Sequence, residues 1–127
     1  MPSPIKTSIL PEALKSMVRA NIRIFLPIGQ QKGVMEILGR YTERTRFLAG
    51  CLSCRLYHDV LDPKAIMLEE VWDDESALNR HLGSDSFRDI LLVIEMASAA
   101  PEVSFIQFSE FSGLERIERV RGDGSGA

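Results

Sequence analysis

The sequence predicts an α+β domain with a ferredoxin-like arrangement, βαββαβ. Two observations lead to this prediction. Residues 17–26 and 51–60 alternate between apolar and polar side chains, and residues 65–72 form a further extended run, as strands do. Two other segments repeat apolar residues three and four positions apart, which is typical of amphipathic helices. The order strand, helix, strand, strand, helix, strand predicts a four-stranded antiparallel sheet with two helices on one face.

Residues 17–26 are expected to form the first strand, because their apolar positions recur with a period of two. One face of this strand is wholly apolar and contains Val18, Ala20, Ile22, Ile24 and Leu26. The opposite face contains Met17, Arg19, Asn21, Arg23 and Phe25. Pro27 and Gly29 end the strand.

The first helix follows this strand. Apolar residues recur at helical spacing at Val34, Ile37, Leu38, Tyr41 and Leu48. We expect Gly50 to end the helix. Gly39, inside the helix, costs about 1 kcal/mol relative to alanine and hints at close backbone packing.

A hairpin and a second helix come next. Residues 51–60 and 65–72 are expected to pair, because an Asp-Pro turn lies between them. Asp73 or Asp74 can cap the helix that follows. We expect this helix to break near Gly83 and then to restart.

The restarted part has an apolar stripe at Phe87, Ile90, Leu91, Ile94 and Ala97. Residues 103–111 are expected to form the fourth strand, because they are rich in aromatic and β-branched side chains. The folded domain therefore spans residues 17–111, after an arm at 1–16 and before a tail at 112–127. The end of the tail, 122–127, is typical of a flexible segment.

Composition excludes several classes of function. The chain has 127 residues, 45% hydrophobic and 26% charged, which suits one soluble domain. A net charge of −3 with scattered basic residues offers no surface for nucleic acid. No apolar run approaches the ~20 residues of a membrane span, and two cysteines are too few for a disulfide framework. We therefore expect a cytoplasmic protein without nucleic-acid or membrane partners.

The polar face of the first strand predicts a homodimer. Both helices are expected on the other side of the sheet, so nothing in the chain covers Arg19, Asn21 and Arg23. Met17 and Phe25 make this face too apolar at both ends for comfortable solvation. A second copy of the same sheet would cover it by two-fold symmetry.

His81 and Glu70 are the candidate catalytic residues. A free imidazole titrates near neutral pH, so His81 could take a proton and return it; otherwise it is a border histidine with a satisfied hydrogen bond. Glu70 shares a strand face with Trp72. If that face looks toward the helices, Glu70 can orient His81 or accept a proton itself; if it looks away, Glu70 belongs to the dimer interface.

Aromatic side chains could form the walls of a substrate site. The candidates for substrate binding are Trp72, Tyr57, Phe87 and Phe105, with core packing as the alternative for each. Arg55 or Arg23 could stabilise an anionic substrate by charge, with an ion pair as the alternative.

Cys51 and Cys54 have the spacing of a redox motif, but residues three apart on a regular strand point to opposite faces. We therefore expect free thiols. Cys54 and His58 would share a face but lie about 13 Å apart at 3.3 Å per residue, too far for one metal ion. No metal site is expected.

Four stretches carry a resemblance to a known family: Pro27–Gly29 after the first strand, Ala49–Cys51, a Val-Leu-Asp-Pro turn, and above all residues 70–87 (EVWDDESALNRHLGSDSF). Over residues 17–110 the chain resembles the antibiotic biosynthesis monooxygenase family of dimeric α+β barrels. The resemblance implies a homodimer with facing sheets and a mostly apolar cleft between sheet and helices. The family includes cofactor-free monooxygenases of phenolic or quinol compounds, haem-degrading enzymes and a signal-molecule isomerase.

The haem-degrading branch fits this chain less well. Its iron-ligating histidine falls four residues after the phenylalanine that matches Phe87, and here that position is Leu91. Its cleft tryptophan matches His81, and its first-strand asparagine lies one register away from Asn21. Members of the quinol-type branch usually have a histidine at the position of His81, so the resemblance favours that branch.

Two functions of different class follow. The first is a monooxygenase that needs no cofactor and acts on a small phenolic, quinol or polyketide-like aromatic substrate in the cleft. The second is a dimer of the same fold that binds a small molecule or a partner without chemistry. An apolar cavity that reaches His81 favours the first, and an interior filled with side chains favours the second.

Overall fold

The computed structural model describes residues 16–126, with side chains described as far as Gly122. The predicted arm, 1–16, therefore lies outside the described residues except for Ser16. In chain order the elements are β1 (Met17–Phe25), η1 (Ile28–Gln30), α3 (Gln31–Thr45), β2 (Cys51–His58), β3 (Ala65–Trp72), α4 (Glu75–Leu82), η2 (Asp85–Phe87), α5 (Arg88–Met96), β4 (Glu102–Phe108) and α6 (Leu114–Gly126).

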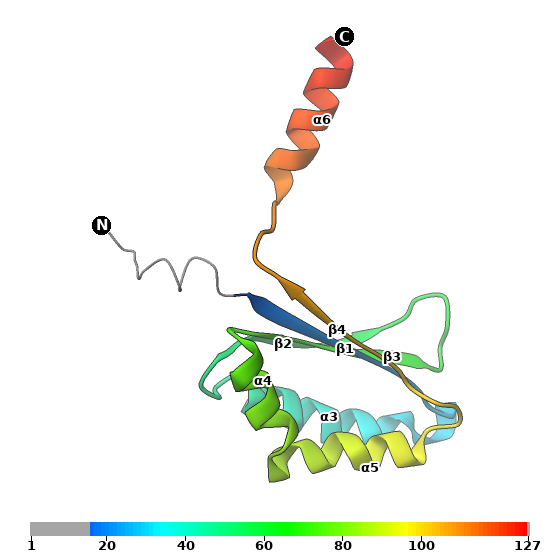
Figure 1. Ribbon diagram of the computed structural model, residues 1–127. Coiled ribbons are helices and arrows are strands. Elements are labelled where there is room, and N and C mark those ends of the chain that lie inside the picture. Colours follow the sequence, from blue (N-terminus) through cyan, green and yellow to red (C-terminus); the bar gives the residue numbers. More distant parts are fainter. Residues whose placement is uncertain (1–15, 127) are drawn as a thin grey trace.

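The four strands form one antiparallel sheet in the order β2-β3-β1-β4, which confirms the predicted ferredoxin-like fold. Helices α3, α4 and α5 cover one face of this sheet, and α6 projects from the other side (Figure 1). The helix that the sequence predicts to break near Gly83 is the pair α4 and α5. The helix layer therefore consists of the first predicted helix, α3, and the interrupted second helix, α4 and α5.

The core lies between the sheet and the helix layer. Leu38 and Tyr41 of α3 pack there with Ile90 and Val93 of α5, and all four are fully buried. Leu91, which the sequence analysis placed in the apolar stripe, is instead 50% exposed. Burial of one large aliphatic side chain contributes about 1.5–3 kcal/mol, so this contact holds helices that are too short to be stable alone.

The first helix is shorter than predicted. It ends at Thr45, because the N–H groups of Phe47 and Leu48 bond to carbonyls three residues back and turn the chain away. Gly50, the predicted stop, lies in the loop before β2 with φ of +88°. Glycine adopts this conformation without strain.

The second strand ends at His58 rather than Val60. The side chain of Asp59 accepts hydrogen bonds from the N–H groups of Leu61 and Asp62 at 2.8 and 3.2 Å. Such an Asx turn replaces strand pairing with a local bond, so the loop begins earlier than the alternation indicates.

A β-bulge at the start of β2 corrects the prediction for the cysteines. The register with β3 shifts between Cys51 and Ser53, which leaves Leu52 as an extra residue. As a result, Cys51 and Cys54 both lie on the sheet face that carries the helices, and both pack against the core. The expectation that they point to opposite faces was wrong because it assumed a regular strand.

The C-terminal part also differs from the prediction. β4 ends at Phe108 and not Phe111, since Phe108 pairs with Met17, the first residue of β1. The tail contains α6, and the segment expected to be flexible, 122–127, is helical as far as Gly126. Between residues 16 and 126, no helix is long and apolar enough to cross a membrane.

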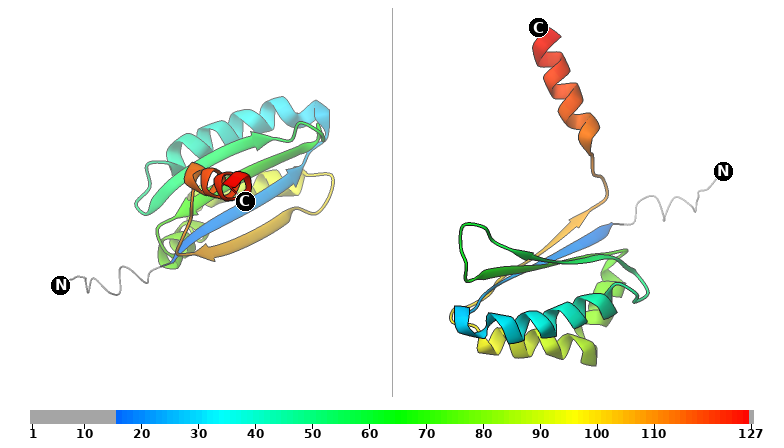
Figure 2. Two further views of the ribbon diagram at one scale, coloured as in Figure 1. Left: turned by 90° about the horizontal axis from the view of Figure 1, so that it is seen from above. Right: turned by 180° about the vertical axis from the view of Figure 1, so that it is seen from behind.

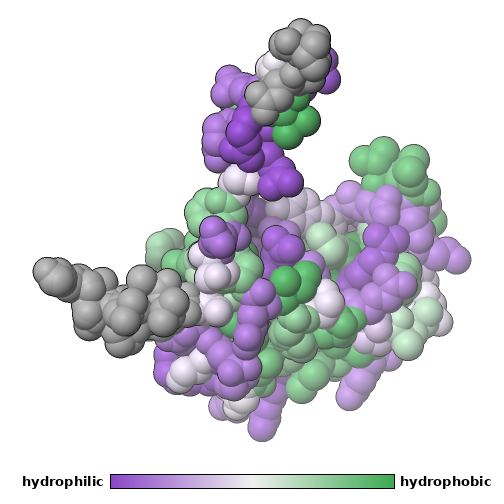
Figure 3. All heavy atoms as spheres, turned by 45° about the horizontal axis from the view of Figure 1, so that its top comes forward, coloured by the Kyte–Doolittle hydropathy of each residue, from purple (hydrophilic) through white to green (hydrophobic). Residues whose placement is uncertain are grey.

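The face of the sheet opposite the helix layer, called the open face below, has no helix of residues 16–126 packed on it. Figure 2 shows α6 extending away from this face, and Figure 3 shows hydrophobic and hydrophilic residues mixed over it. Its apolar members include Met17, Phe25, Met67, Val71, Ile106 and Phe108. Arg19 Nε and Asn21 Oδ1 are buried on it without a hydrogen-bond partner.

Gly50→Ala should destabilise the fold by about 1–3 kcal/mol. A Cβ at this position would lie 2.6 Å from the Cβ of Ala77, and φ of +88° strains any L side chain. Gly39→Ala is the matched control, because a Cβ there meets nothing within 4 Å. The close packing hinted at for Gly39 is therefore absent, and Gly39→Ala should raise the free energy of unfolding by up to about 1 kcal/mol. Urea unfolding measures both, and equal midpoints would contradict this account.

Candidate functional site

Glu70 lies on the helix side of β3, which decides between the two placements that the sequence left open. The buried residues of β3 alternate from Ile66 through Leu68 and Glu70 to Trp72. The Glu70 side chain is only 1% exposed. A carboxyl group at this depth requires hydrogen-bond donors, because its desolvation is otherwise strongly unfavourable.

Side chains from three elements surround this carboxyl group. Trp72 of β3 donates its indole N–H to Oε1 at 2.9 Å, and Tyr41 of α3 donates its hydroxyl to Oε2 at 2.5 Å. His81 of α4 places Nε2 3.6 Å from Oε1. We call Tyr41, Glu70, Trp72 and His81 the buried polar cluster.

Tyr41 bridges Glu70 and His81. Its oxygen lies 2.6 Å from His81 Nε2. Burial, and then the negative charge of Glu70, raise the pKa of the Tyr41 phenol well above its usual range, so the hydroxyl keeps its proton. That proton is donated to Glu70; the oxygen therefore accepts from His81, and Nε2 carries the imidazole hydrogen.

With the hydrogen on Nε2, Nδ1 is the acceptor nitrogen whenever the imidazole of His81 is neutral. Nδ1 is buried and has no hydrogen-bond partner in the part of the chain that the structure describes. Unpaired buried nitrogens are uncommon in folded proteins and call for an explanation. In this cluster every other polar side-chain atom has a partner among the described residues. The cluster thus presents one unused proton acceptor.

Aromatic contacts fix the orientation of His81. Asp74 caps α4 by accepting the N–H of Ala77 at 2.8 Å, which sets where the helix begins. Trp72 stacks on the imidazole with ring centroids 4.7 Å apart, and Phe87 meets it edge-on at 5.7 Å. The sequence placed His81 at the border of the apolar stripe that faces the sheet, and in the structure the residue is buried.

A pocket of about 300 Å³ reaches the cluster. It lies between α4, the loop before β2 and the segment after α4, and its surface is mostly apolar. Its lining residues are Leu48, Ala49, Trp72, Ala77, Arg80, His81, Ser84 and Ser86. A partly open apolar hollow that ends on an indole and an imidazole is a suitable place for a flat organic molecule.

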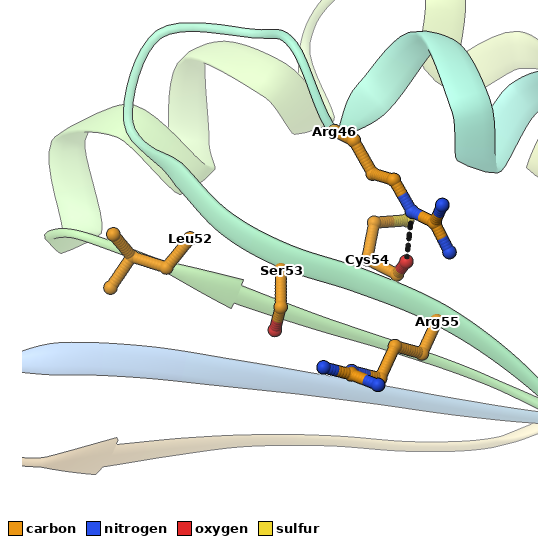
Figure 4. Close-up of a pocket in the computed structure, with 5 residues that line it drawn as sticks. All are labelled: Arg46, Leu52, Ser53, Cys54 and Arg55. Carbon is orange, nitrogen blue, oxygen red and sulfur yellow. Dashed lines mark hydrogen bonds between the residues drawn. The ribbon is translucent and has the colours of Figure 1, made fainter.

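Two predicted binding residues lie far from this pocket, on the open face. Tyr57 donates its hydroxyl to Glu69 at 3.1 Å. Figure 4 shows Arg46 and Arg55 on opposite sides of β2: Arg46 bonds the Cys54 carbonyl at 3.1 Å, and Arg55 extends away from the helix layer. The structure therefore does not bring Tyr57 and Arg55 together with His81.

Two further candidates also lie elsewhere. Arg23, the alternative cation, pairs with Asp59 at 2.9 Å on the open face. Phe105 is on the helix side of the sheet but lines a separate hollow with Leu78 and Leu82. That hollow adjoins α4 residues other than His81, so Phe105 is not a wall of the pocket that reaches the imidazole.

Sequence reasoning missed the role of Tyr41. It placed this residue on the apolar stripe of the first helix, which is correct as far as burial is concerned. The signal available was chemical, since a buried tyrosine hydroxyl needs a polar partner. The partner could be identified only once Glu70 was known to face the helices.

The two cysteines are free and unreactive in character. Burial, and then the nearby Glu70 carboxylate, raise the pKa of the Cys51 thiol to about 11 and that of Cys54 to about 12. A thiol with such a pKa is a poor nucleophile and a poor metal ligand at neutral pH. Within residues 16–126, no three His, Cys, Asp or Glu side chains are grouped so as to hold a metal ion.

The sequence matches the family model described as antibiotic biosynthesis monooxygenase over residues 17–91. The chain belongs to this family. The matched segment runs from β1 into α5 and includes all four residues of the buried polar cluster. A search of curated proteins found no match.

Solved structures with a similar fold agree with the ferredoxin-like fold of this member of the antibiotic biosynthesis monooxygenase family. A conserved protein from Methanosarcina mazei Go1 has 21% identity and a TM-score of 0.68, over 77% of this chain and 97% of its own. A structure described as an antibiotic biosynthesis monooxygenase has 22% identity and a TM-score of 0.66, over 76% and 99%. Rv0793 from Mycobacterium tuberculosis has 21% identity and a TM-score of 0.68, over 78% and 99%. Identities at this level show a shared fold.

The thiols of the folded protein should label slowly. With pKa values of about 11 and about 12, only about 10⁻³ to 10⁻⁴ of each is thiolate at pH 8, and the fraction rises tenfold per pH unit below the pKa. A thiol reagent should therefore react at least about 100-fold faster after denaturation. Rapid labelling of the native protein at pH 8, or a disulfide in unreduced protein, would contradict this placement.

Proposed function

We propose that this protein is a cofactor-independent monooxygenase that acts on a small phenolic or quinol compound in the pocket between sheet and helices. The observation that carries the proposal is Nδ1 of His81, which is buried and unpaired in a residue that lines an apolar pocket. Membership of the antibiotic biosynthesis monooxygenase family is in agreement with it. His81 is the proposed base, and Glu70 and Tyr41 position it.

The first step is a proton transfer. A substrate hydroxyl placed against Nδ1 gives its proton to the ring, because Nε2–H is already used toward Tyr41. The imidazolium that forms is stabilised by the tyrosine oxygen at 2.6 Å and by the Glu70 carboxyl group at 3.6 Å from Nε2. Glu70 thus fixes the tautomer of His81 and stabilises its positive charge without touching the substrate.

The second step draws its electrons from the substrate. A deprotonated para-hydroquinone can reduce O₂ directly: one oxygen atom forms a bond to a ring carbon, and the other leaves as water with two substrate hydrogens. Hydroquinone and O₂ therefore give hydroxyquinone and water, and four electrons pass from the ring to oxygen. Trp72, Ala77 and Leu48 offer apolar walls that exclude water from the reactive anion.

A second candidate function is binding without chemistry. The buried polar cluster also ties α3 and α4 to β3, and that structural role alone would retain Tyr41 and Glu70. The unpaired Nδ1 favours the catalytic function, because a purely structural histidine gains from having both nitrogens bonded. Absence of turnover, with ligands still bound, would favour the binding function.

We also propose that the protein is a cytoplasmic homodimer closed through the open face. The antibiotic biosynthesis monooxygenase family is generally dimeric. The open face carries apolar side chains and two buried polar atoms without partners, on Arg19 and Asn21. A second sheet would cover the apolar groups and offer partners to these atoms.

His81→Gln should lower turnover by about 10²- to 10⁴-fold, since glutamine can donate to Tyr41 but cannot take up the substrate proton. Oxygen uptake with a panel of hydroquinones, naphthols and anthrones measures the rate. Tyr41→Phe should give a smaller loss, because it removes the bond that fixes the tautomer and leaves the imidazole in place.

His58→Gln is the matched control, because His58 is the chain's other histidine and is exposed on β2. It should leave the rate unchanged. If wild-type protein turns over a substrate and His81→Gln retains full activity, His81 is not the base. Circular dichroism of each variant separates a lost proton acceptor from a lost fold.

Sedimentation should show a species of twice 14.2 kDa at micromolar concentration. Ile106→Glu, at a position on the open face that is 40% exposed, should weaken association at least about tenfold, because dimer formation would desolvate the new carboxylate in the interface. Leu91→Glu, 50% exposed on the helix layer, should leave the dimer intact. A wild-type monomer, or dissociation caused only by Leu91→Glu, would refute closure through the open face.

A further inference from the structure

We propose that Arg80 selects the substrate: the pocket takes hydroxyaryl compounds that carry a carboxylate, and Arg80 binds this carboxylate. The proposal rests on the function proposed above and names its substrate class. Arg80 lines the pocket together with His81, one residue further along α4. It assigns the cationic role that the sequence analysis gave to Arg55 or Arg23 to a different residue.

Charge distribution around the pocket supports this assignment. Arg44, which reaches Ser86, also pairs with Asp89 at 2.8 Å, and Arg88 lies 3.6 Å from Asp85. Arg80, by contrast, forms no ion pair with any carboxylate among residues 16–126. Arg80 is an exposed residue, so its charge is available to a ligand. A guanidinium group binds a carboxylate in a bidentate manner, which fixes orientation as well as affinity.

The hydroxyl groups that line the pocket point to the same ligand chemistry. Ser86 Oγ accepts a bond from Arg44 at 3.4 Å, so its own proton remains available to a ligand oxygen. Ser84 donates its proton to the His81 carbonyl at 2.7 Å and offers none to a ligand. The residues that line the pocket therefore include donors, Arg80 and Ser86, and one residue, His81, whose Nδ1 has no partner among the described residues.

This polarity defines a ligand with two different ends. One end needs a hydroxyl to donate to His81, the other needs an acceptor, preferably anionic, for Arg80, and the part between must be flat and apolar to lie beside Trp72 and Ala77. A hydroxyaryl carboxylate has this order of groups. The Arg80 charge would also lower the cost of forming a phenolate in the same pocket.

Volume limits the size of the ring system. At about 300 Å³, the pocket is at the lower end of the ~300–1,000 Å³ typical of small-molecule sites. One ring or two fused rings fit such a space together with their substituents. A naphthalene scaffold is therefore a suitable size for a binding test.

The test compares two ligands of similar shape. One, 6-hydroxy-2-naphthoate, carries a charged carboxylate, and the other, 6-hydroxy-2-naphthamide, carries a neutral amide in its place. Calorimetric titration of the whole protein should show the carboxylate binding at least about tenfold more tightly than the amide. Arg80→Met should abolish this difference, and Arg80→Lys should keep part of it, since a point charge replaces the bidentate group. Arg40→Met, an exposed arginine of α3 that does not line the pocket, should change nothing.

Binding is measured without turnover, so the two proposals fail separately. Equal affinity of the two probes for the wild type, or a preference retained in Arg80→Met, overturns the assignment of Arg80 even if neutral hydroquinones are oxidised. If Arg80→Met loses the preference for the carboxylate while the wild type shows no oxygen uptake with any hydroxyaryl acid, that pair of results supports the proposed class of ligand and overturns the monooxygenase function. If Arg80→Met binds neither ligand while Arg80→Lys still binds them, the result supports a requirement for a positive charge at position 80.

Discussion

The hydrogen bonding of one buried carboxyl group governs how this molecule is assembled. Glu70 points from the middle of the sheet into the helix layer, where water cannot solvate it. The cost of such burial is several kcal/mol, and it is offset only when each oxygen finds a donor. Trp72 supplies one donor from the same strand and Tyr41 supplies the other from α3. Hydrogen bonds as well as apolar packing therefore fix the position of α3 over β3. Tyr41 also contacts His81, so the same bonds help to position α4.

Periodicity was enough to predict the fold, because the period of two in β1 and the helical spacing in α3 reflect burial on one side of each element. It did not predict the local exceptions. The bulge at Leu52 changes the face of Cys51 without changing composition, and the Asx turn at Asp59 ends a strand whose alternation continues. Each exception arises from a local backbone bond or an inserted residue, to which a pattern of apolar positions is blind.

The site was predictable only in part for a related reason. His81, Glu70, Trp72 and Phe87 lie together, because a strand end and the following helix bring near neighbours in sequence into contact. Tyr41 joins them from 29 residues before Glu70, a contact that only the packing of α3 creates. Tyr57 and Arg55 were misplaced for the opposite reason: alternation along β2 identified their common face, and only the sheet topology showed which layer that face meets. Family membership added the fold and left the chemistry to these side chains.

α4 is a helix of eight residues, well below the length at which a helix is stable by itself. It stays in place because Asp74 caps it and because His81 is bonded through Tyr41 to the rest of the core. The pocket is bounded by this helix on one side and by the loop at Leu48 and Ala49 on the other. A molecule bound between them contacts α4, which is too short to be stable alone, so ligand binding is thermodynamically linked to folding. At a ligand concentration 100 times its dissociation constant, that linkage amounts to about 2.7 kcal/mol. Resistance to heat would then vary with the supply of ligand, and an empty site would leave the protein closer to its unfolding threshold.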